Sequence, residues 1–342
     1  MKVGIWAPVY GGWLRIKNHQ YRPSFAVCNE IASRAETNCY DYIYVSENYL
    51  NVVYGPSQEV ADAWAYAAAL AANTSKISIV VATKPGFHSP LPLARMAHGI
   101  NHISNNRLSI NIVCGWWKKE FTQCGVKYLD HQGRYQRATE FTQCLKQLWT
   151  GENTSFSGKY FLLQDALIAM EDLEEGRIPI WISGQSTDAQ RLVAQYGDVF
   201  FIDSMPDEKL EQTIQQIRDL ESKYRNKVKI AMSVFVILDK TKEQAERRYM
   251  KILSGRQQDL IENFKRIMAE SGATMWKGLT DEQMVDSNCG FDASLIGDRA
   301  TILNRLKLLQ GYGVDILLCQ FENMLDDTEK FGKTVLPQLR AA

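Results

Sequence analysis

Short apolar runs rich in β-branched residues recur along the chain, and each precedes a segment whose apolar positions follow a helical period. The predicted strands lie at 3–7, 42–46, 77–83, 107–113, 178–183, 199–203, 228–238 and 315–319. The helices that follow them are predicted at 24–37, 57–72, 90–103, 133–149, 187–195, 207–224, 242–270 and 326–336. In the second helix Val60, Trp64, Ala67 and Ala71 form one apolar face, and Ser57 offers an N-cap.

Eight strand–helix units in regular alternation predict an α/β fold with a parallel sheet. A doubly wound open sheet usually has five or six strands, so eight units favour a closed TIM (β/α)8 barrel. Such a barrel needs about 250 residues, and the chain has 342. The surplus falls into two insertions, at 151–177 and 242–300. Because no Pro/Gly/Ser-rich linker interrupts the alternation, we expect one domain over 1–342.

The charge balance argues against several classes of partner. Lys plus Arg and Asp plus Glu number 39 each, which gives no net field for nucleic acid or an acidic membrane. The apolar runs are too short to cross a bilayer, and Met1 leads directly into the first strand without a signal-peptide pattern. Seven scattered cysteines show neither disulfide-framework nor zinc spacing. We expect a cytoplasmic protein with reduced thiols, no metal site, and a small molecule as its ligand.

Chemistry in a TIM barrel belongs at the carboxyl ends of the strands. The sequence lacks GxSxG, HExxH, GxGxxG and P-loop motifs, so the usual hydrolase, zinc-protease and nucleotide signals are missing. Glu47 and Glu120 follow strands, but their distance in sequence makes them weak evidence for paired acid–base catalysis. The strand ends are instead rich in aromatic residues, which suit a flat ring cofactor or, alternatively, fill a core or an oligomer interface. They are Trp6, Tyr10, Trp13, Tyr54, Phe87, Trp116 and Trp117.

Two helix starts offer chemistry for an anion. The residues 182–186 close a strand and open a helix, so backbone amides and the Ser186 hydroxyl would face a phosphate there. The residues 130–135 open another helix, on which His131 and Tyr135 lie one turn apart and share a face. Each signal alone is also typical of an ordinary turn or cap.

These motifs together resemble the bacterial luciferase-like family of flavin-dependent monooxygenases. The resemblance rests on 111–125, on 130–141, on the phosphate loop 179–186, and on the C-terminal stretches 295–318 and 331–337. Within the family the pattern is most similar to the dimethylsulfone monooxygenases, with pyrimidine oxygenases and alkanesulfonate monooxygenases further away. The segments that carry this finer similarity are 6–8, 115–121, 275–276 and 288–297.

The chain departs from the alkanesulfonate enzymes at the positions that would hold a sulfonate. Those enzymes carry Arg and His on strand seven, where this chain has Ser233 and Phe235, and an Arg near the position of Asn288. Their cysteine just before the Asp-x-Trp motif of the second helix corresponds to Val60. A buried anion without a cationic partner costs several kcal/mol in order of magnitude. A neutral substrate is therefore expected.

The resemblance implies reduced FMN as a bound substrate that reacts with O2 to give a flavin peroxide, used here on a small neutral organosulfur compound such as a sulfone, with C–S cleavage. Because no nicotinamide motif is present, a separate NAD(P)H:flavin reductase would supply FMNH2. The implied roles divide by ligand. Flavin contacts fall to Ala82, Thr83, Asn111, His131, Tyr135, Gly184, Gln185 and Ser186, substrate contacts to Trp6, Tyr54, His88, Trp116 and Phe235, and catalysis to Asn111, Trp116 and Glu120.

Three alternatives remain open at this point. The same flavin chemistry could serve N-, C- or S-oxygenation of a heterocycle or biosynthetic intermediate. A deazaflavin-dependent reductase on the same barrel, or a flavin-binding protein without catalysis, would use the same scaffold. The 242–300 insertion is expected to form a lid with 287–291 as its moving part, or else to pack on the barrel or a partner subunit. A homodimer or homotetramer is expected from the family.

Overall fold

The structure is a computed structural model that describes residues 1–17, 21–169, 178–271, 276 and 278–341. Parts of both predicted insertions, 170–177 in the first and 272–275 and 277 in the second, lie outside the described residues. None of the described helices combines the length and the apolar character needed to cross a membrane.

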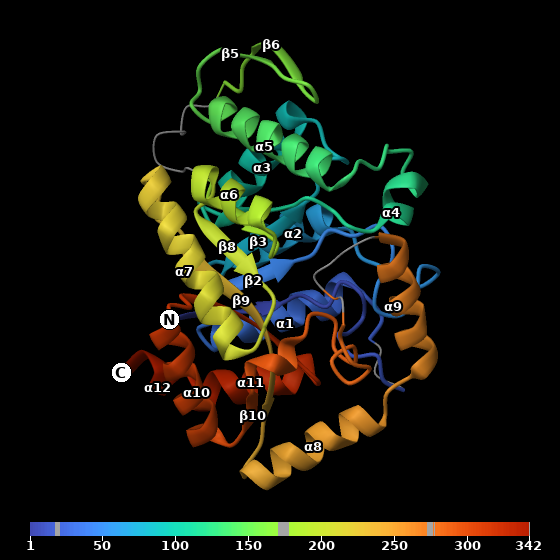
Figure 1. Cartoon of the computed structure of the whole chain (residues 1–342). Helices are drawn as coiled ribbons and strands as arrows, with labels where there is room; N and C mark the ends of the chain where they lie inside the picture. Colours follow the sequence, from blue (N-terminus) through green and yellow to red (C-terminus); the bar gives the residue numbers. More distant parts are fainter. Residues whose placement is uncertain (18–20, 170–177, 272–275, 277, 342) are drawn as a thin grey trace.

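Eight parallel strands close into a barrel, which confirms the predicted fold class (Figure 1). Each strand pairs with the next in chain order, and β1 pairs with β11 to close the ring. The extra strand β10, Leu295–Gly297, pairs in parallel with the carboxyl end of β9, at Val236–Leu238. The barrel strands are β1 Lys2–Trp6, β2 Tyr42–Val45, β3 Ser78–Thr83, β4 Leu108–Val113, β7 Ile180–Ser183, β8 Val199–Ile202, β9 Lys229–Leu238 and β11 Ile316–Phe321.

Helices surround the barrel, and most begin within two residues of the predicted position. They are α1 Phe25–Thr37, α2 Ala63–Asn73, α3 Pro90–Ile103, α5 His131–Leu148, α6 Thr187–Tyr196, α7 Asp207–Tyr224, α10 Arg299–Tyr312 and α11 Met324–Thr334, followed by α12 Leu336–Ala341. The short α4, Lys118–Gln123, and the helix α10 were not predicted.

The predicted start of the second helix at Ser57 is wrong. The helix begins at Ala63, and its N-cap is Asp62, whose carboxylate accepts the backbone N–H of Ala65 at 2.7 Å. Gly55 has a φ of 109°, and Ala61 donates its backbone N–H to the Val9 carbonyl, so the preceding segment is held in turns against the first strand–helix loop. Val60 therefore lies before the helix.

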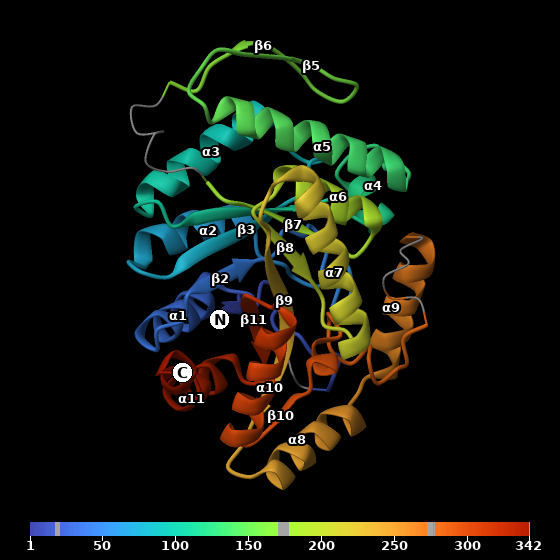
Figure 2. The ribbon, with the colours of Figure 1, turned by 60° about the vertical axis from the view of Figure 1, so that its left-hand side comes forward.

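The predicted helical region 242–270 is two helices, α8 Lys242–Ser254 and α9 Gln258–Ser271. The break follows Gly255, where the backbone exchanges hydrogen bonds with the segment after β1. Lys17 donates to the Gly255 carbonyl at 3.1 Å and Gln257 donates to the Arg15 carbonyl at 2.8 Å. Figure 2 shows both helices outside the ring of barrel helices.

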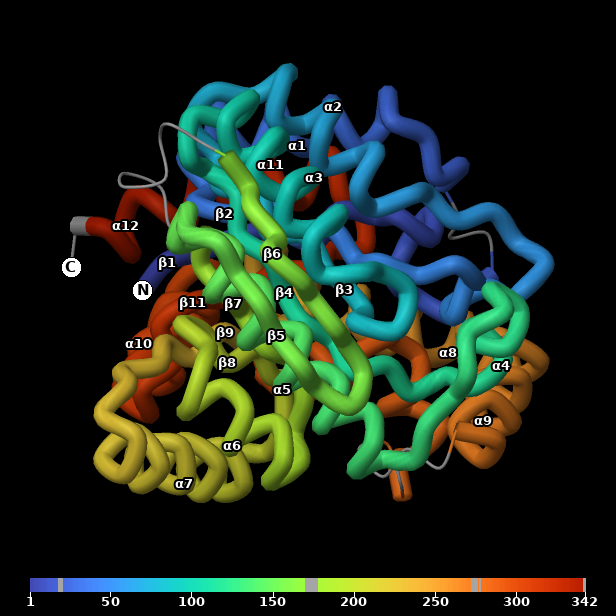
Figure 3. Tube along the Cα trace, turned by 90° about the horizontal axis from the view of Figure 1, so that it is seen from above, coloured from blue at the N-terminus to red at the C-terminus, as the bar shows by residue number. Residues whose placement is uncertain are grey.

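The other insertion contains a hairpin of β5 Thr154–Ser157 and β6 Leu162–Ala166. Figure 3 shows the hairpin passing over α5. Glu140 on α5 holds its turn, since its carboxylate accepts the backbone N–H groups of Lys159, Tyr160 and Phe161 at 2.7–3.2 Å.

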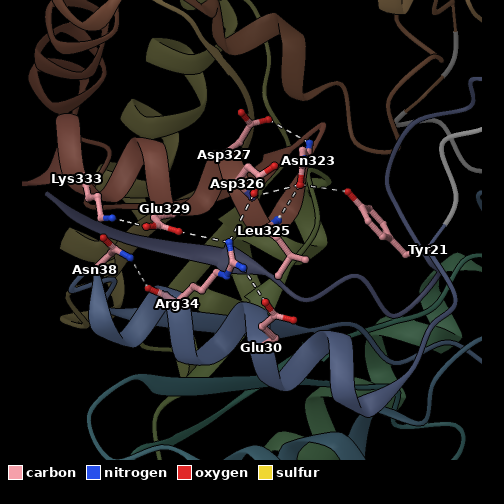
Figure 4. A network of polar contacts seen from close by, with 10 residues as sticks. All are labelled: Tyr21, Glu30, Arg34, Asn38, Asn323, Leu325, Asp326, Asp327, Glu329 and Lys333. Carbon is pink, nitrogen blue, oxygen red and sulfur yellow. Dashed lines mark hydrogen bonds and ion pairs between the residues drawn. The ribbon is translucent and has the colours of Figure 1, made fainter.

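The first and last barrel helices are joined on the outer surface (Figure 4). Arg34 on α1 donates to Glu329 on α11 at 3.4 Å and to Glu30 at 2.7 Å. Asn323 caps α11 by accepting the N–H groups of Leu325 and Asp326, both at 3.2 Å. Exposed ion pairs of this kind contribute about 0–1 kcal/mol, so the β1–β11 pairing and the apolar core are what close the barrel.

Strand pairing also decides which side chains point into the barrel. Trp6 and Phe201 come from strands that are not neighbours, yet their ring centroids are 5.6 Å apart, so both face the interior. Residues paired in register across parallel strands share a face. Phe201 pairs with Ala231, which pairs with Ile316. Because every second residue of a strand shares a face, Ser233, Phe235 and Gln320 also face the interior.

Candidate active site

An aromatic wall lies at the mouth of the barrel, as the strand ends predict. Trp6 packs on Trp13 at 5.1 Å and on Tyr44 at 4.7 Å between ring centroids, and Trp13 packs on Tyr10 at 5.5 Å. All four side chains are buried, and the Trp6 indole donates to Ser46 Oγ at 2.6 Å. The hydrogen bond fixes the indole plane, so the wall is rigid.

Asn111 lies inside the barrel and is fully buried. Its Nδ2 donates to Tyr44 Oη at 2.8 Å and lies 2.7 Å from Ser183 Oγ, which in turn lies 3.0 Å from Asn111 Oδ1. Burial raises the pKa of the Tyr44 phenol, so it stays protonated. The sequence pattern found Asn111 and missed Tyr44, whose inward position follows only from the strand pairing.

Ala82 and Thr83 end β3, but their side chains face opposite ways. Ala82 pairs with Asn111 and shares the interior face, whereas Thr83 pairs with Ile112 on the outer face. Thr83 is fully buried there, and its Oγ1 has no hydrogen-bond partner in the described part of the chain. A contact of Thr83 with a ligand in the barrel would therefore involve its backbone.

The residues of the predicted phosphate seat lie together at the start of α6. Gly184 has a φ of 144°, and a Cβ placed on it would lie 2.9 Å from both Tyr135 Oη and Ala189 Cβ. Only glycine therefore allows Tyr135 and Ala189 to approach the backbone of this cradle so closely. Ser186 caps α6 by accepting the Ala189 N–H at 3.2 Å. Gln185, between Gly184 and Ser186 in the sequence, is half-buried.

His131 and Tyr135 share one face of α5, as predicted, with ring centroids 4.8 Å apart. Burial raises the pKa of the Tyr135 phenol, and a hydrogen bond with Ser186 opposes that rise. His131 is about half exposed and lies 3.1 Å from Asp188 Oδ2 in the first turn of α6. The two helix starts therefore meet, and the free N–H groups of α6 with the Tyr135 hydroxyl can bind an anion.

Glu47 and Glu120, far apart in sequence, meet at Lys84. The Lys84 ammonium lies 2.6 Å from Glu120 Oε2, and the Lys84 backbone N–H donates to Glu47 Oε2 at 2.6 Å. Glu120 also accepts the Tyr49 backbone N–H at 2.7 Å, and its side chain is 1% exposed. Both Glu120 oxygens are thus engaged, which suits an anchoring role for the mouth loops.

His88 belongs to the same buried cluster. Its Nε2 lies 2.5 Å from Glu47 Oε1, and the Trp64 indole donates to that oxygen at 3.2 Å. Lys84 further donates to Asn48 Oδ1 at 2.7 Å, and Asn48 bonds Tyr10 of the aromatic wall. The cluster therefore positions the wall rather than presenting a free acid.

Phe235 lies inside the barrel beneath the segment after α9. The short 3-10 helix Gly290–Ala293 covers it, with Phe291 at 4.7 Å between ring centroids. Asp286 holds this segment by accepting the N–H groups of Asn288, Gly290 and Phe291 at 2.8–3.2 Å. The predicted moving part of the lid thus has a defined position over Phe235, and its movement stays a prediction.

Trp116 and Tyr54 lie around the rim. Trp116 is half-buried and packs edge-on against Trp276 at 4.5 Å, close to α9. Tyr54 lies near the fully buried Arg15, whose guanidinium donates to the carbonyls of Met284 and Asp286. The rim is therefore built jointly by the strand-end loops and the second insertion.

Gln320 is another residue of the barrel interior that the sequence pattern did not assign to the site. It faces the barrel interior beside Phe235, is fully buried, and neither amide atom has a hydrogen-bond partner among the described residues. Asp203, which directly follows β8, lies 3.4 Å from Ser233 Oγ, and burial raises the pKa of its carboxyl to about 7. The interior thus offers a neutral amide and an acid. Among the described residues no cation forms an ion pair with Asp203, although the charge of Lys209 opposes the rise of its pKa.

The chain is similar to known proteins over most or all of its length. The sequence profile of the family described as luciferase-like monooxygenase matches residues 1–315. The FMNH2-dependent dimethylsulfone monooxygenase of Pseudomonas putida is 28% identical over 348 residues, covering 99% of this chain and 95% of that protein. Among solved structures, a long-chain alkane monooxygenase has a TM-score of 0.84 at 16% identity, covering 100% of this chain and 91% of that one. An F420-dependent secondary alcohol dehydrogenase has a TM-score of 0.75 at 18% identity, covering 99% of each.

Proposed function

Because the chain belongs to the luciferase-like monooxygenase family, we propose that it is a two-component monooxygenase that uses reduced FMN and O2 on a small neutral organosulfur compound. The relatives named FMNH2-dependent dimethylsulfone monooxygenases support the flavin and the substrate class. Bound reduced FMN would supply the electrons that activate O2. A separate NAD(P)H:flavin reductase would deliver it, and the chain would act as a homodimer or homotetramer.

The cradle at Gly184 is the observation that carries the flavin proposal. The close approach of the Tyr135 hydroxyl to Gly184 and the first turn of α6 fit a phosphate monoester. Ser186, Gln185 and His131 would complete this seat. Asn111 and Ala82 face the barrel interior and would contact the ring, where the hydrogen bonds from Asn111 to Tyr44 and Ser183 fix the amide orientation.

The aromatic wall and the cover over Phe235 would exclude water from the reacting atoms. Trp6 and Phe235 would form apolar walls for the substrate, with Trp116 and Tyr54 at the rim. Glu120 and His88 would hold the mouth loops in place through Lys84 and Glu47, so their contribution is positional.

The charges at the substrate side favour a neutral substrate. Asp203 is buried without an ion pair in the described part of the chain, and its raised pKa reflects that environment. A sulfonate placed beside it would be a second uncompensated buried anion. Gln320 instead offers an amide N–H donor, which suits a neutral oxygen such as that of a sulfone.

Anaerobic titration with reduced FMN, followed by an oxygen pulse with and without dimethylsulfone, tests the proposal. We expect saturable binding of reduced FMN and product release that depends on the sulfone, with ethanesulfonate as the charged control. Failure to bind reduced FMN would refute the proposal. Binding of a deazaflavin without oxygen consumption would favour the reductase alternative, and turnover of a heterocycle instead of the sulfone would replace the substrate class. Rapid turnover of ethanesulfonate would refute the charge argument.

A further inference from the structure

A second pocket of about 730 Å³ lies outside the barrel mouth, on another face of α5. Its walls are the loop after β3, the loop before α5 and the turn of the β5–β6 hairpin. Figure 1 shows the hairpin above α5, the helix from which Arg137 comes. None of the proposed flavin-seat residues that precede α6, Gly184, Gln185 and Ser186, lines this pocket.

Arg137 carries a buried positive charge in the wall of this pocket. The residue is 8% exposed, and its Nε and Nη2 have no hydrogen-bond partner in the described part of the chain. Its guanidinium lies against Gly86, because a Cβ placed on Gly86 would be 2.6 Å from Arg137 Nη2, and over the Phe121 ring at 5.6 Å. No described carboxylate pairs with it, so the charge is compensated by an aromatic face alone.

Nε and Nη2 form the edge of a guanidinium that binds a carboxylate or phosphate through two parallel hydrogen bonds. Leaving such donors unpaired in a buried position costs free energy, about 1–3 kcal/mol or more for a charged group. A rotation of the guanidinium away from Gly86 toward the pocket would give both donors an anionic partner.

The rest of the pocket suits the same kind of ligand. Lys127 and Lys159 add two further cations to its lining, and Tyr128 and Tyr160 add aromatic rings. The one carboxylate in the lining, Asp130, is engaged as the N-cap of α5, where it accepts the Gly133 N–H at 2.8 Å. The lining therefore combines an excess of positive charge with planar apolar surface.

The pocket is separate from the proposed flavin seat. Tyr135 and Arg137 are two residues apart on α5, so their side chains project about 200° apart around the helix axis. Tyr135 Oη approaches Gly184 on one side, and Arg137 approaches Gly86 on the other. One ligand in the cradle therefore leaves the second pocket accessible.

We propose that this pocket binds a small organic anion, with its carboxylate or phosphate paired to Arg137 and Lys159 and an aromatic body against Tyr128 and Tyr160. The volume accommodates a molecule well beyond the size of a phenyl phosphate. His88 also lines the pocket and connects it to the cluster that holds the mouth loops. The proposal does not rest on the substrate class, and the pocket exists whether or not that class is right.

Isothermal titration of the full chain with phenyl phosphate and benzoate, and with benzamide as the neutral control, tests this site. We expect one molecule bound per chain and at least tenfold weaker binding of benzamide. Arg137→Gln and Lys159→Gln should each weaken phenyl phosphate binding by about tenfold or more, the value of one charge-assisted pair. Lys251→Gln, which removes one exposed charge on α8, should leave the affinity unchanged. Inorganic phosphate should bind more weakly than phenyl phosphate, because it lacks the aromatic body.

The titration is repeated on protein saturated with FMN. Unchanged phenyl phosphate affinity supports a separate site, and competition by FMN overturns it because the probe then occupies the cradle. Equal binding of benzamide, or no binding of either anion, also refutes the proposal. If Arg137→Gln does not fold, Lys159→Gln decides the matter, since Lys159 lies exposed on the hairpin turn and its loss does not disturb the core.

Discussion

Replacing Gln320 by leucine should stabilise the protein while weakening its binding of substrate. The Gln320 side chain is fully buried inside the barrel, and both amide atoms are unpaired in the described part of the chain. An unsatisfied buried polar group costs about 1–3 kcal/mol, and leucine fills a similar volume without polar atoms. Gln320→Leu should therefore raise the free energy of unfolding by about 1–3 kcal/mol.

The size of the chain sets the change in Tm that corresponds to this gain. An unfolding entropy of about 2.1 cal/mol/K per residue for 342 residues converts it into a rise of about 1–4 °C in Tm. Urea unfolding followed by tryptophan fluorescence measures the free energy, and calorimetry measures the Tm. Gln190→Leu is the matched control, because Gln190 is also buried but donates to Gln216 at 2.9 Å. That variant should lose stability.

The functional half of the prediction follows from the lost donor. With dimethylsulfone and a partner reductase, Gln320→Leu should raise KM about three- to tenfold, the value of one hydrogen bond, with a smaller effect on kcat. FMN affinity should stay unchanged because the cradle at Gly184 is untouched. A destabilised Gln320→Leu variant with an unchanged KM would show that the amide serves the fold and would refute the reasoning.

Four further outcomes are expected. Glu120→Gln removes the charge partner of the buried Lys84 and should cost about 3–5 kcal/mol in urea unfolding; a loss below 1 kcal/mol would mean that water reaches the pair. Tyr135→Phe should weaken FMN binding about tenfold, as one hydrogen bond to a charged group predicts, and equal affinity in a fluorescence titration would remove Tyr135 from the seat. Gly184→Ala places a methyl group 2.9 Å from Tyr135 Oη at a φ of 144°, so the affinity for FMN should fall further than in Tyr135→Phe. Gln185→Ala, which changes the half-buried neighbour, should lower the affinity for FMN less. Asp203 has a folded-state pKa of about 7 against an ordinary 3.8, so the folded state binds its proton more tightly and the free energy of unfolding should fall as pH rises from about 4 to about 7. Asp203→Asn should flatten that decline when unfolding is measured across this pH range. The same decline in the variant as in the unmodified protein would contradict this prediction.

The boundaries of the barrel elements could be predicted because local pattern controls them. The alternation of apolar strands with segments of helical period depends only on residues that are close in sequence. The helices α3 and α7 accordingly match their predicted ranges. The same local rules failed where long-range contacts intervene. Asp62 rather than Ser57 caps α2 because the preceding turn is bonded to Val9, and the break between α8 and α9 is set by bonds to the segment after β1.

The sequence by itself determined the family resemblance and predicted a phosphate seat and a neutral substrate, since each rests on short motifs or on the identity of single residues such as Ser233. Tertiary structure alone decided which side chains meet. Closure of the barrel brings Glu47 and Glu120 to one lysine, turns Gln320 inward without a partner, and leaves Arg137 buried beside a second pocket. The physical reason is that the cost of a buried charge or amide depends on its neighbours in space, and strand pairing sets those neighbours across separations of tens to hundreds of residues.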